Sequence, residues 1–314
     1  MSKGYVVVFG ASVVDIFGFS SNKYRPYNST PGRVKMSFGG VCRNIAENLA
    51  RVQVDTRFIS VVGNDEKGRS MIEHSELIGY DMSETLVLKN GGTPTYLAIL
   101  NEKGEMVSAI ADMSAIAELN TSFIDEKAQI IRGADYVFVD ADSPQNLEYM
   151  LDTFSGSTKF ILDPVSAEKA ISIKHLLGKF HTIKPNRYEA EVLVGFEIES
   201  DDDLRRAGDF FLDQGVKNVF ISLDSEGIYF TDGVRHLKIT AENVSVCNVT
   251  GAGDSFVAGL GYGYMSDTDI VTTIKRAMTM SNIAILSDET INPDLSPEFV
   301  DRLISETKWL VRDL

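Results

Sequence analysis

A run of three small residues and one carboxylate, Gly251-Ala252-Gly253-Asp254, stands where a loop is expected to lead into a helix. Small residues leave room for an anion, and the free N–H groups at the start of a helix attract one. A carboxylate at that place can accept the proton of a hydroxyl group that attacks phosphorus. The run is therefore typical of phosphoryl transfer, although a glycine turn with Asp254 as the helix N-cap fits the same four residues.

A glycine pair, Gly39-Gly40, also precedes a predicted helix, and Asn44 lies one turn into that helix. Two glycines allow a ligand to approach the backbone closely. The Asn44 amide and the carboxylate of Asp15, which follows the first apolar run, could together hold the vicinal hydroxyls of a sugar. A surface amide at Asn44 and a structural carboxylate at Asp15 remain alternatives.

Asn186 and Glu189 are three residues apart at another expected helix start. This spacing is that of a capping box, in which each side chain satisfies a free backbone N–H group. The same oxygens could instead hold waters of a hydrated magnesium ion that bridges nucleotide phosphates. Further along, Ser222 and Gly227 flank a turn that is either a simple hairpin connection or one wall of a nucleotide site.

Short apolar runs alternate with longer helical patterns through the middle of the chain. The predicted strands cover residues 136–140, 159–163, 181–184 and 218–223. This βαβ order predicts an α/β protein whose mainly parallel central sheet is covered by helices on both faces. Such sheets bind ligands at the carboxyl ends of their strands. Three polar residues stand at strand ends here, namely Asp163, Asn186 and Asp224.

Two segments interrupt this order, at about residues 15–38 and 93–112. The first alternates without a helical period, and the second predicts two strands joined at residues 101–104. We expect the two segments to form a small separate sheet, inserted into one domain that spans residues 1–314. Such a sheet could close over a cleft and exclude water, although a plain hairpin decoration is also compatible with these residues.

The acidic composition limits the classes of partner. With 30 Lys and Arg residues against 45 Asp and Glu residues, the net charge of −15 disfavours binding to nucleic acids and anionic membranes. A small nucleotide remains compatible, because a few local donors and a metal ion can outweigh a screened global charge. The sequence has no signal-like start, no 18-residue apolar run and only Cys42 and Cys247 as cysteines, so it predicts a cytoplasmic protein.

Two common nucleotide-binding motifs are missing from the chain. No Gly-x-x-x-x-Gly-Lys-Ser/Thr sequence occurs, so a P-loop is excluded. Gly251-x-Gly253 is followed by Phe256 where a dinucleotide site needs a third small residue. Hydride transfer therefore lacks its main support.

Three motifs occur jointly and in order: Gly39-Gly40-x-x-x-Asn44, Asn186-x-x-Glu189 and Thr250-Gly251-Ala252-Gly253-Asp254. In this combination essentially the whole chain resembles the ribokinase-like (PfkB) family of sugar and nucleoside kinases. The resemblance implies a three-layer α/β fold with a β-sheet lid, a homodimer formed through that lid, and ATP with Mg²⁺ as cofactors. It makes Asp254 the catalytic base and residues 251–254 the anion hole. It assigns the sugar to Asp15, Gly39, Gly40 and Asn44, and magnesium with phosphate to Asn186 and Glu189.

The resemblance assigns further roles in nucleotide and cation binding. Ser222 and Gly227 match the family's nucleotide-binding turn, and Asn282 matches a position near adenine. Many relatives carry an acidic residue two positions before Thr250, where it helps to bind a monovalent cation, whereas this chain has Asn248. An amide binds a cation less strongly than a carboxylate, so dependence on K⁺ is a weaker expectation.

Longer phrases resemble the pseudouridine kinases of that family, at residues 31–35, 163–167, 181–187, 248–250 and 292–296. This resemblance implies transfer to the 5′-hydroxyl of pseudouridine. The rival functions are a kinase for adenosine, uridine or ribose, and a non-catalytic regulator that binds a nucleoside. Polar residues that could read the base are Thr93, Thr95, Asp112, Ser166 and Lys169.

Overall fold

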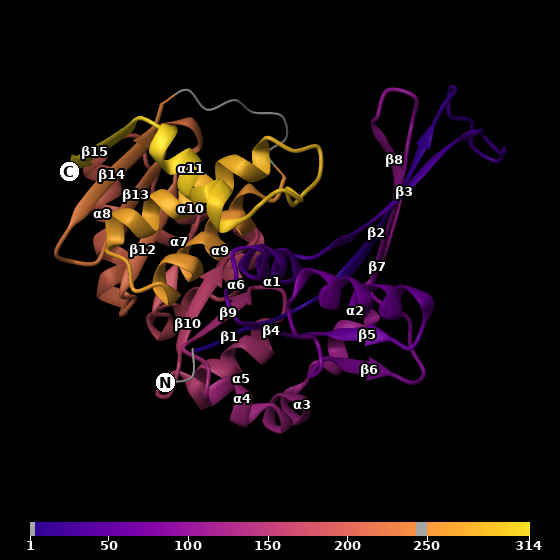
Figure 1. Cartoon of the computed structure of the whole chain (residues 1–314), viewed down its shortest axis with the longest axis horizontal. Helices are drawn as coiled ribbons and strands as arrows, with labels where there is room; N and C mark the ends of the chain where they lie inside the picture. The colour runs from indigo at the N-terminus through magenta and orange to yellow at the C-terminus, as the bar shows by residue number, and fades with distance from the viewer. Residues whose placement is uncertain (1–3, 243–249) are drawn as a thin grey trace.

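The main body of the protein is built on one large sheet in the computed structural model, which describes residues 4–242 and 250–314 (Figure 1). The strand order is β15 (Trp309–Asp313), β14 (His236–Ala241), β13 (Ile228–Thr231), β12 (Asn218–Ser222), β11 (Thr182–Ile183), β10 (Lys159–Asp163), β9 (Tyr136–Asp140), β1 (Val6–Phe9) and β4 (Thr56–Ile59). Neighbours from β12 to β4 pair in parallel, whereas β12, β13, β14 and β15 pair antiparallel. The carboxyl ends of the parallel strands therefore meet along one edge.

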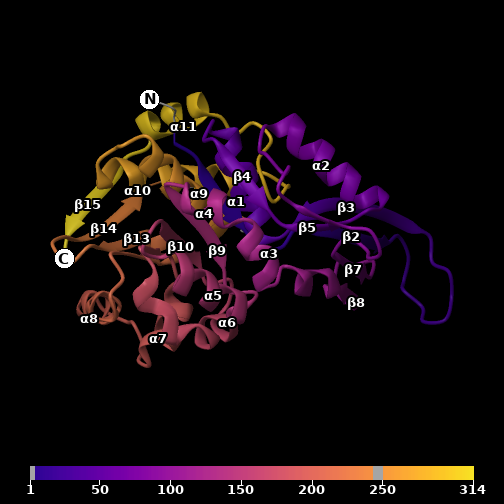
Figure 2. The same ribbon diagram turned by 90° about the horizontal axis from the view of Figure 1, so that it is seen from below.

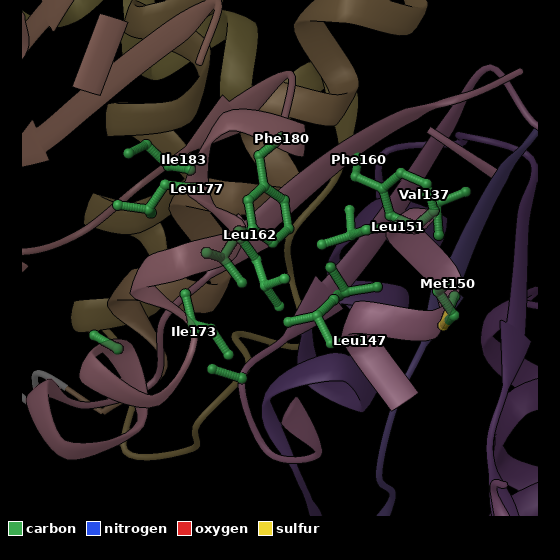
Figure 3. Packing of buried hydrophobic residues seen from close by; sticks show 14 of the residues in the cluster. Val137, Leu147, Met150, Leu151, Phe160, Leu162, Ile173, Leu177, Phe180 and Ile183 are labelled. Atoms are coloured by element: carbon green, nitrogen blue, oxygen red, sulfur yellow. The ribbon is translucent and has the colours of Figure 1, made fainter. Parts of the chain in front are cut away.

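Both faces of this sheet are covered, which explains why its central strands are continuously apolar. In β1, Val6 and Val8 pack into one core while Val7 and Phe9 pack into the other. One face carries α1 (Val41–Arg51), α9 (Ala252–Met265), α10 (Ile270–Ile285) and α11 (Pro297–Glu306), and the other carries α5 (Pro144–Phe154), α6 (Ala167–Ser172), α7 (Arg187–Val194) and α8 (Asp201–Gln214) (Figure 2). Figure 3 shows the second core, where Leu147 of α5 lies among apolar side chains from the sheet.

A separate sheet of four strands extends away from this body (Figure 1). Its order is β3 (Gly32–Gly39), β2 (Val13–Ser20), β7 (Thr95–Leu100) and β8 (Met106–Asp112). The central pair β2 and β7 is parallel, and the outer strands pair antiparallel. All seven residues of β8 are exposed, so one edge of the sheet lies in solvent.

The remaining elements lie outside the two larger sheets. They are α2 (Glu66–Ile78), α3 (Thr121–Glu126), α4 (Ala128–Arg132), the two-stranded pair β5 (Val61–Gly63) and β6 (Leu86–Leu88), and 3₁₀ turns at Ser114–Glu118, Lys174–Lys179 and Asp224–Glu226. Within residues 4–242 and 250–314, no helix combines the length and apolar character needed to cross a membrane.

The predicted three-layer α/β architecture is confirmed, together with its small separate sheet. The strands expected at residues 136–140 and 159–163 are β9 and β10 with the same bounds. The strand expected at residues 181–184 is shorter, because only Thr182 and Ile183 belong to β11. The role of the small sheet as a lid stays a prediction.

Candidate active site

Charged side chains gather where the parallel strands of the large sheet end. Asp140 ends β9, Asp163 ends β10, and Lys184 directly follows β11. All three residues are buried, with at most 7% of their surface exposed. Buried charges are rare unless they are paired or bind a ligand, so this edge is the natural place for a functional site.

The start of α9 lies at this edge and is shaped by glycine. Gly251 is the N-cap, with φ 79°, and as a glycine it has no side chain to cap the helix. A Cβ atom on Gly251 would lie 2.3 Å from the carbonyl oxygen of Thr290, so only glycine fits there. Asp254 is the third residue after the cap, which overturns the alternative that Asp254 itself is the N-cap. The N-cap residue therefore offers no side-chain acceptor to the first N–H groups of α9, and these groups could bind an anion.

The Asp254 carboxylate is held by α1 and not by its own helix. Asn44 Nδ2 donates a hydrogen bond of 2.7 Å to Asp254 Oδ2. Asn44 is 6% exposed, which excludes the alternative of a surface amide. One turn further, Ser255 Oγ donates to Asn48 Oδ1 at 2.9 Å, so two contacts lock α1 against α9. The structure thus brings together two of the three sequence motifs.

Burial, together with the negative charge of Asp163, raises the pKa of Asp254 to about 7. The hydrogen bond from Asn44 and the positive charges of Lys184 and Arg43 oppose this shift. A carboxylate with such a pKa is a far better proton acceptor than an ordinary aspartate at neutral pH. The environment of Asp254 therefore suits a general base.

An ion-pair network behind Asn44 fixes its amide group. Arg43 Nη2 donates to Asn44 Oδ1, and Arg43 Nη1 pairs with Glu47. Glu47 also contacts Arg51 and His74. Burial alone would raise the pKa of Glu47, but these partners lower that pKa to about 2. Because its oxygen is engaged by Arg43, the Asn44 amide presents its NH₂ group to Asp254.

Asp15 and the glycine pair form the adjoining part of the site. A Cβ atom on Gly39 would lie 2.0 Å from Asp15 Oδ2, so the carboxylate rests on the Gly39 backbone. Gly40 has φ 99° and lies against the carbonyl oxygen of Ala11, where a Cβ atom would be only 2.7 Å away. Burial raises the pKa of Asp15 against the opposing charge of Arg43. Gly40 is thus required by its φ and by its backbone contact with Ala11, whereas a side chain at Gly39 would displace the Asp15 carboxylate.

Asn186 and Glu189 form a complete capping box at the start of α7. Glu189 N donates to Asn186 Oδ1 and Asn186 N donates to Glu189 Oε2, each at 2.8 Å. Glu189 is nevertheless 5% exposed, and burial raises the pKa of its carboxyl group. Its Oε1 is outside the capping box and can still accept a hydrogen bond. The capping role is therefore present, and it leaves room for the predicted magnesium role.

The predicted nucleotide turn lies beside this box. Ser222 forms an isolated parallel bridge with Asn186, and Ser222 N donates to the carbonyl oxygen of Pro185 at 3.0 Å. Gly227 has φ 94°, and a Cβ atom there would lie 2.1 Å from the carbonyl oxygen of Ile239. The turn joins the antiparallel strands β12 and β13, so the hairpin connection is present.

The proposed base-reading residues do not all lie near Asp254. Thr93 is buried, and its hydroxyl bonds to Asp65 and to the N–H group of Gly63. Thr95 binds Lys67, and the register of β2 and β7 directs Thr95 away from the face that carries Asp15. Asp112 is the register partner of Thr95 and therefore lies on the same face as Thr95, opposite to Asp15. These three residues lie toward α2, and their predicted role remains untested.

The other predicted positions lie on three different elements. Ser166 caps α6, and Lys169 pairs with Asp142, two residues after β9. Asn282 lies on α10, which packs against α9. Thr250 precedes the cap of α9, and Asn248 lies outside the described residues. The monovalent-cation site therefore stays a prediction.

Sequence reasoning missed three charged residues of the site, namely Arg43, Asp163 as a partner of Asp254, and Lys184. Each stands next to a motif residue or at a strand end, and that adjacency was the available signal. Among the described residues, no three of the His, Cys, Asp and Glu side chains gather closely enough to hold a metal ion. Asn186 and Glu189 would supply one amide oxygen and one carboxylate. These donors fit a magnesium ion that keeps most of its water shell and arrives with a nucleotide.

The chain matches the pfkB family of carbohydrate kinases over residues 3–297. The chain belongs to this family. The pseudouridine kinase of Escherichia coli strain K12 is 32% identical to this pfkB-family kinase over 310 residues, which cover 98% of this chain and 99% of that protein. The chain is thus an ATP-dependent phosphotransferase that acts on a sugar or nucleoside.

Solved structures of related proteins share the fold of this pfkB-family kinase. A candidate sugar kinase from Clostridium perfringens has a TM-score of 0.97 and 58% identity, covering 100% of this chain and 99% of that one. Ribokinase of Arabidopsis thaliana, complexed with ribose and ATP, has a TM-score of 0.83 and 19% identity, covering 96% and 98%. The ribokinase-like fold predicted from the motifs is confirmed.

Proposed function

We propose that this kinase transfers the γ-phosphoryl group of ATP to the 5′-hydroxyl of pseudouridine. The observation that carries the proposal is the half-buried Asp254 carboxylate, which lies at the start of α9 and is held by Asn44 at 2.7 Å. The similarity to a pseudouridine kinase over nearly the whole chain favours this acceptor. The long phrases that resemble pseudouridine kinases point the same way.

Asp254 accepts the proton of the 5′-hydroxyl as that oxygen attacks the γ-phosphorus. The new O–P bond forms while the bond from the γ-phosphorus to the β-γ bridging oxygen breaks, which yields the nucleoside 5′-monophosphate and ADP. The N–H groups at the start of α9 stabilise negative charge on the transferring group. Asp15 and Asn44 orient the ribose, so the attacking oxygen is held near Asp254.

Magnesium supplies positive charge at the nucleotide phosphates when it is bound. Asn186 and Glu189 would hold its water shell, with Glu189 Oε1 as the acceptor that the capping box does not use. Ser222 and Gly227, on the neighbouring turn, would contact the nucleotide.

The proposed function is tested by measuring ADP release with a panel of ribose, adenosine, uridine and pseudouridine. We expect the highest kcat/KM with pseudouridine. A clear preference for another acceptor would show that pseudouridine is not the substrate, but the assignment as a kinase would stand. Ligand binding without turnover for every acceptor would instead favour a nucleoside-binding regulator.

Turnover should depend on pH through Asp254. The base must be ionised, and its pKa is raised to about 7 in the free enzyme. We therefore expect kcat/KM for the nucleoside to fall about tenfold per pH unit below that value and to level off above it. The measurement is a pH profile at saturating MgATP. A profile that stays flat down to pH about 5 would contradict the assignment of Asp254 as the base.

Replacing Asn44 by Ala should weaken nucleoside binding more than ATP binding. The variant loses the amide that borders the sugar site and that donates to Asp254. The bond lost to the nucleoside joins two neutral groups and is worth about 0.5–1.5 kcal/mol, so the nucleoside Kd should rise roughly 2- to 10-fold. Titration calorimetry with each ligand separates the two effects. If only ATP binding suffered, the sugar site would lie elsewhere.

The four-stranded sheet would act as a lid and as the contact surface of a homodimer. Met36, Ile16, Leu97 and Ile110 are register partners across the sheet and therefore lie on one face. Met36 is 54% exposed and Ile110 is 68% exposed. An exposed apolar face of this kind is typical of a surface covered by a partner, and a second copy of the chain would supply the same face in return.

The dimer is tested by replacing Ile110 with Asp. A charge on the apolar face should shift the protein from dimer to monomer in sedimentation or light scattering. The matched control is Val234→Asp, because Val234 is 88% exposed and lies in the turn between β13 and β14, away from the small sheet. If wild type and both variants all have the mass of a dimer, the interface lies elsewhere. If all three have the mass of a monomer, the proposed dimer does not form.

A further inference from the structure

Lys184 is a buried cation that the mechanism above does not use. It follows β11 and is 5% exposed. Its ammonium group lies against the second residue of α9, because a Cβ atom on Gly253 would be 3.0 Å from Lys184 Nζ. A point charge is thus fixed next to the first N–H groups of α9, where a phosphate is expected to bind.

The partner of Lys184 leaves donors available. Among the described residues, Asp163 is the one carboxylate within ion-pair distance of Nζ, at 3.4 Å. Charged hydrogen bonds of this type are usually about 2.7–2.9 Å, and an ammonium group has three N–H donors. A buried ion pair with one long contact contributes little to stability. A purely structural ion pair would be expected to have a shorter distance between Lys184 Nζ and Asp163 Oδ2.

The opposite side of Asp163 is held by a strained backbone. Val165 has φ 68°, which is unfavourable for a β-branched residue, and its N–H group donates to Asp163 Oδ1 at 2.8 Å. Such strain persists only where surrounding contacts enforce it, and it is concentrated at functional sites. The corner that follows β10 therefore fixes Asp163, which in turn fixes Lys184.

We infer that Lys184 is a further catalytic residue of this kinase, whose ammonium group contacts a non-bridging oxygen of the phosphoryl group while it is transferred. Asp163 is a positioning residue that aims the ammonium group at the start of α9. The inference rests on the proposed role of that helix start as the anion site, but not on the identity of the acceptor. In transfer, Lys184 keeps its proton and supplies charge, while Asp254 takes the proton of the hydroxyl.

The charges around this pair support the assignment. Asp163, Glu189 and Asp254 offset the effect of burial and raise the pKa of Lys184, so the ammonium form is maintained. Asp254 in turn faces Asp163 from β10, Lys184 from the end of β11, and Asn44 and Arg43 from α1. Removing the cation or its partner should therefore alter the ionisation of Asp254 in opposite directions.

The test replaces Lys184 by Met and uses whichever acceptor gives turnover in the panel. Loss of one donor to the transferring group should lower kcat about 100-fold, with the Kd values of ADP and nucleoside within threefold of wild type. Affinity for ADP with aluminium fluoride, which mimics the transferring phosphoryl group, should fall in parallel with kcat. The matched control is Lys127→Met, because Lys127 pairs with Glu84 at 2.8 Å and is also mostly buried.

The pH profile provides the second readout. Lys184→Met should move the acidic limb of kcat/KM to higher pH, and Asp163→Asn should lower kcat while moving that limb to lower pH. Unchanged kcat in either variant would overturn the inference. So would a parallel loss of ADP binding, nucleoside binding and melting temperature, which indicates a structural pair. If wild type has no activity with pseudouridine but phosphorylates another acceptor, the proposed substrate fails and this inference is still tested.

Discussion

Replacing Asp254 by Asn should lower kcat about a hundredfold or more, while nucleoside binding persists. The amide has the shape of the carboxylate but cannot accept the proton of the attacking hydroxyl. Its oxygen can still accept the hydrogen bond from Asn44 Nδ2, so the contact between α1 and α9 is retained. The loss should therefore appear in the chemical step and not in the fold.

Single-turnover rates and nucleoside Kd values measure this effect. The matched control is Asp269→Asn, because Asp269 is the N-cap of α10 and Asn caps a helix equally well. The control should keep wild-type turnover and melting temperature. Near wild-type turnover in Asp254→Asn would remove the general base from the mechanism, whatever acceptor is used.

The fold could be predicted because its signals are local. The strands β9 and β10 are short apolar runs bounded by polar residues, and the segments between them are long enough for helices. The pairing in the small sheet was harder to predict from the sequence, since β2 and β7 pair in parallel although about 80 residues separate them in the chain. The sequence indicated both segments, but only the structure gives their register.

The site was predicted where a motif combines glycine geometry with a functional group. Gly251 and Asp254 are only three positions apart in the sequence, so a loop and a helix start were sufficient to define them. Lys184 and Asp163 meet because β10 and β11 are neighbours in the sheet, and no local pattern indicates that pairing. Thr95 illustrates the converse, because a shift of one residue in a strand turns a side chain to the opposite face.

Replacing Gly251 by Ala should nearly abolish turnover, since the start of α9 would have to move. A Cβ atom would lie 2.3 Å from the carbonyl oxygen of Thr290, and both colliding groups belong to the backbone or are fixed to it. The φ of 79° adds strain of about 1–2 kcal/mol for any residue with a side chain. Displacing the first N–H groups of α9 by about 1 Å can cost roughly a hundredfold in rate.

Gly79→Ala separates the steric effect from the strain. Gly79 ends α2 with φ 103°, and no atom lies within 4 Å of a Cβ atom built there. Both variants should lose stability through backbone strain, and Gly251→Ala should lose more because its Cβ atom also collides with Thr290. Thermal unfolding measures both losses, and only Gly251→Ala should lose activity. If the two variants turn over at similar rates, the N–H groups of α9 do not form the phosphate site. If Gly251→Ala alone is inactive and still binds nucleoside, the start of α9 is required for phosphoryl transfer and not for holding the acceptor.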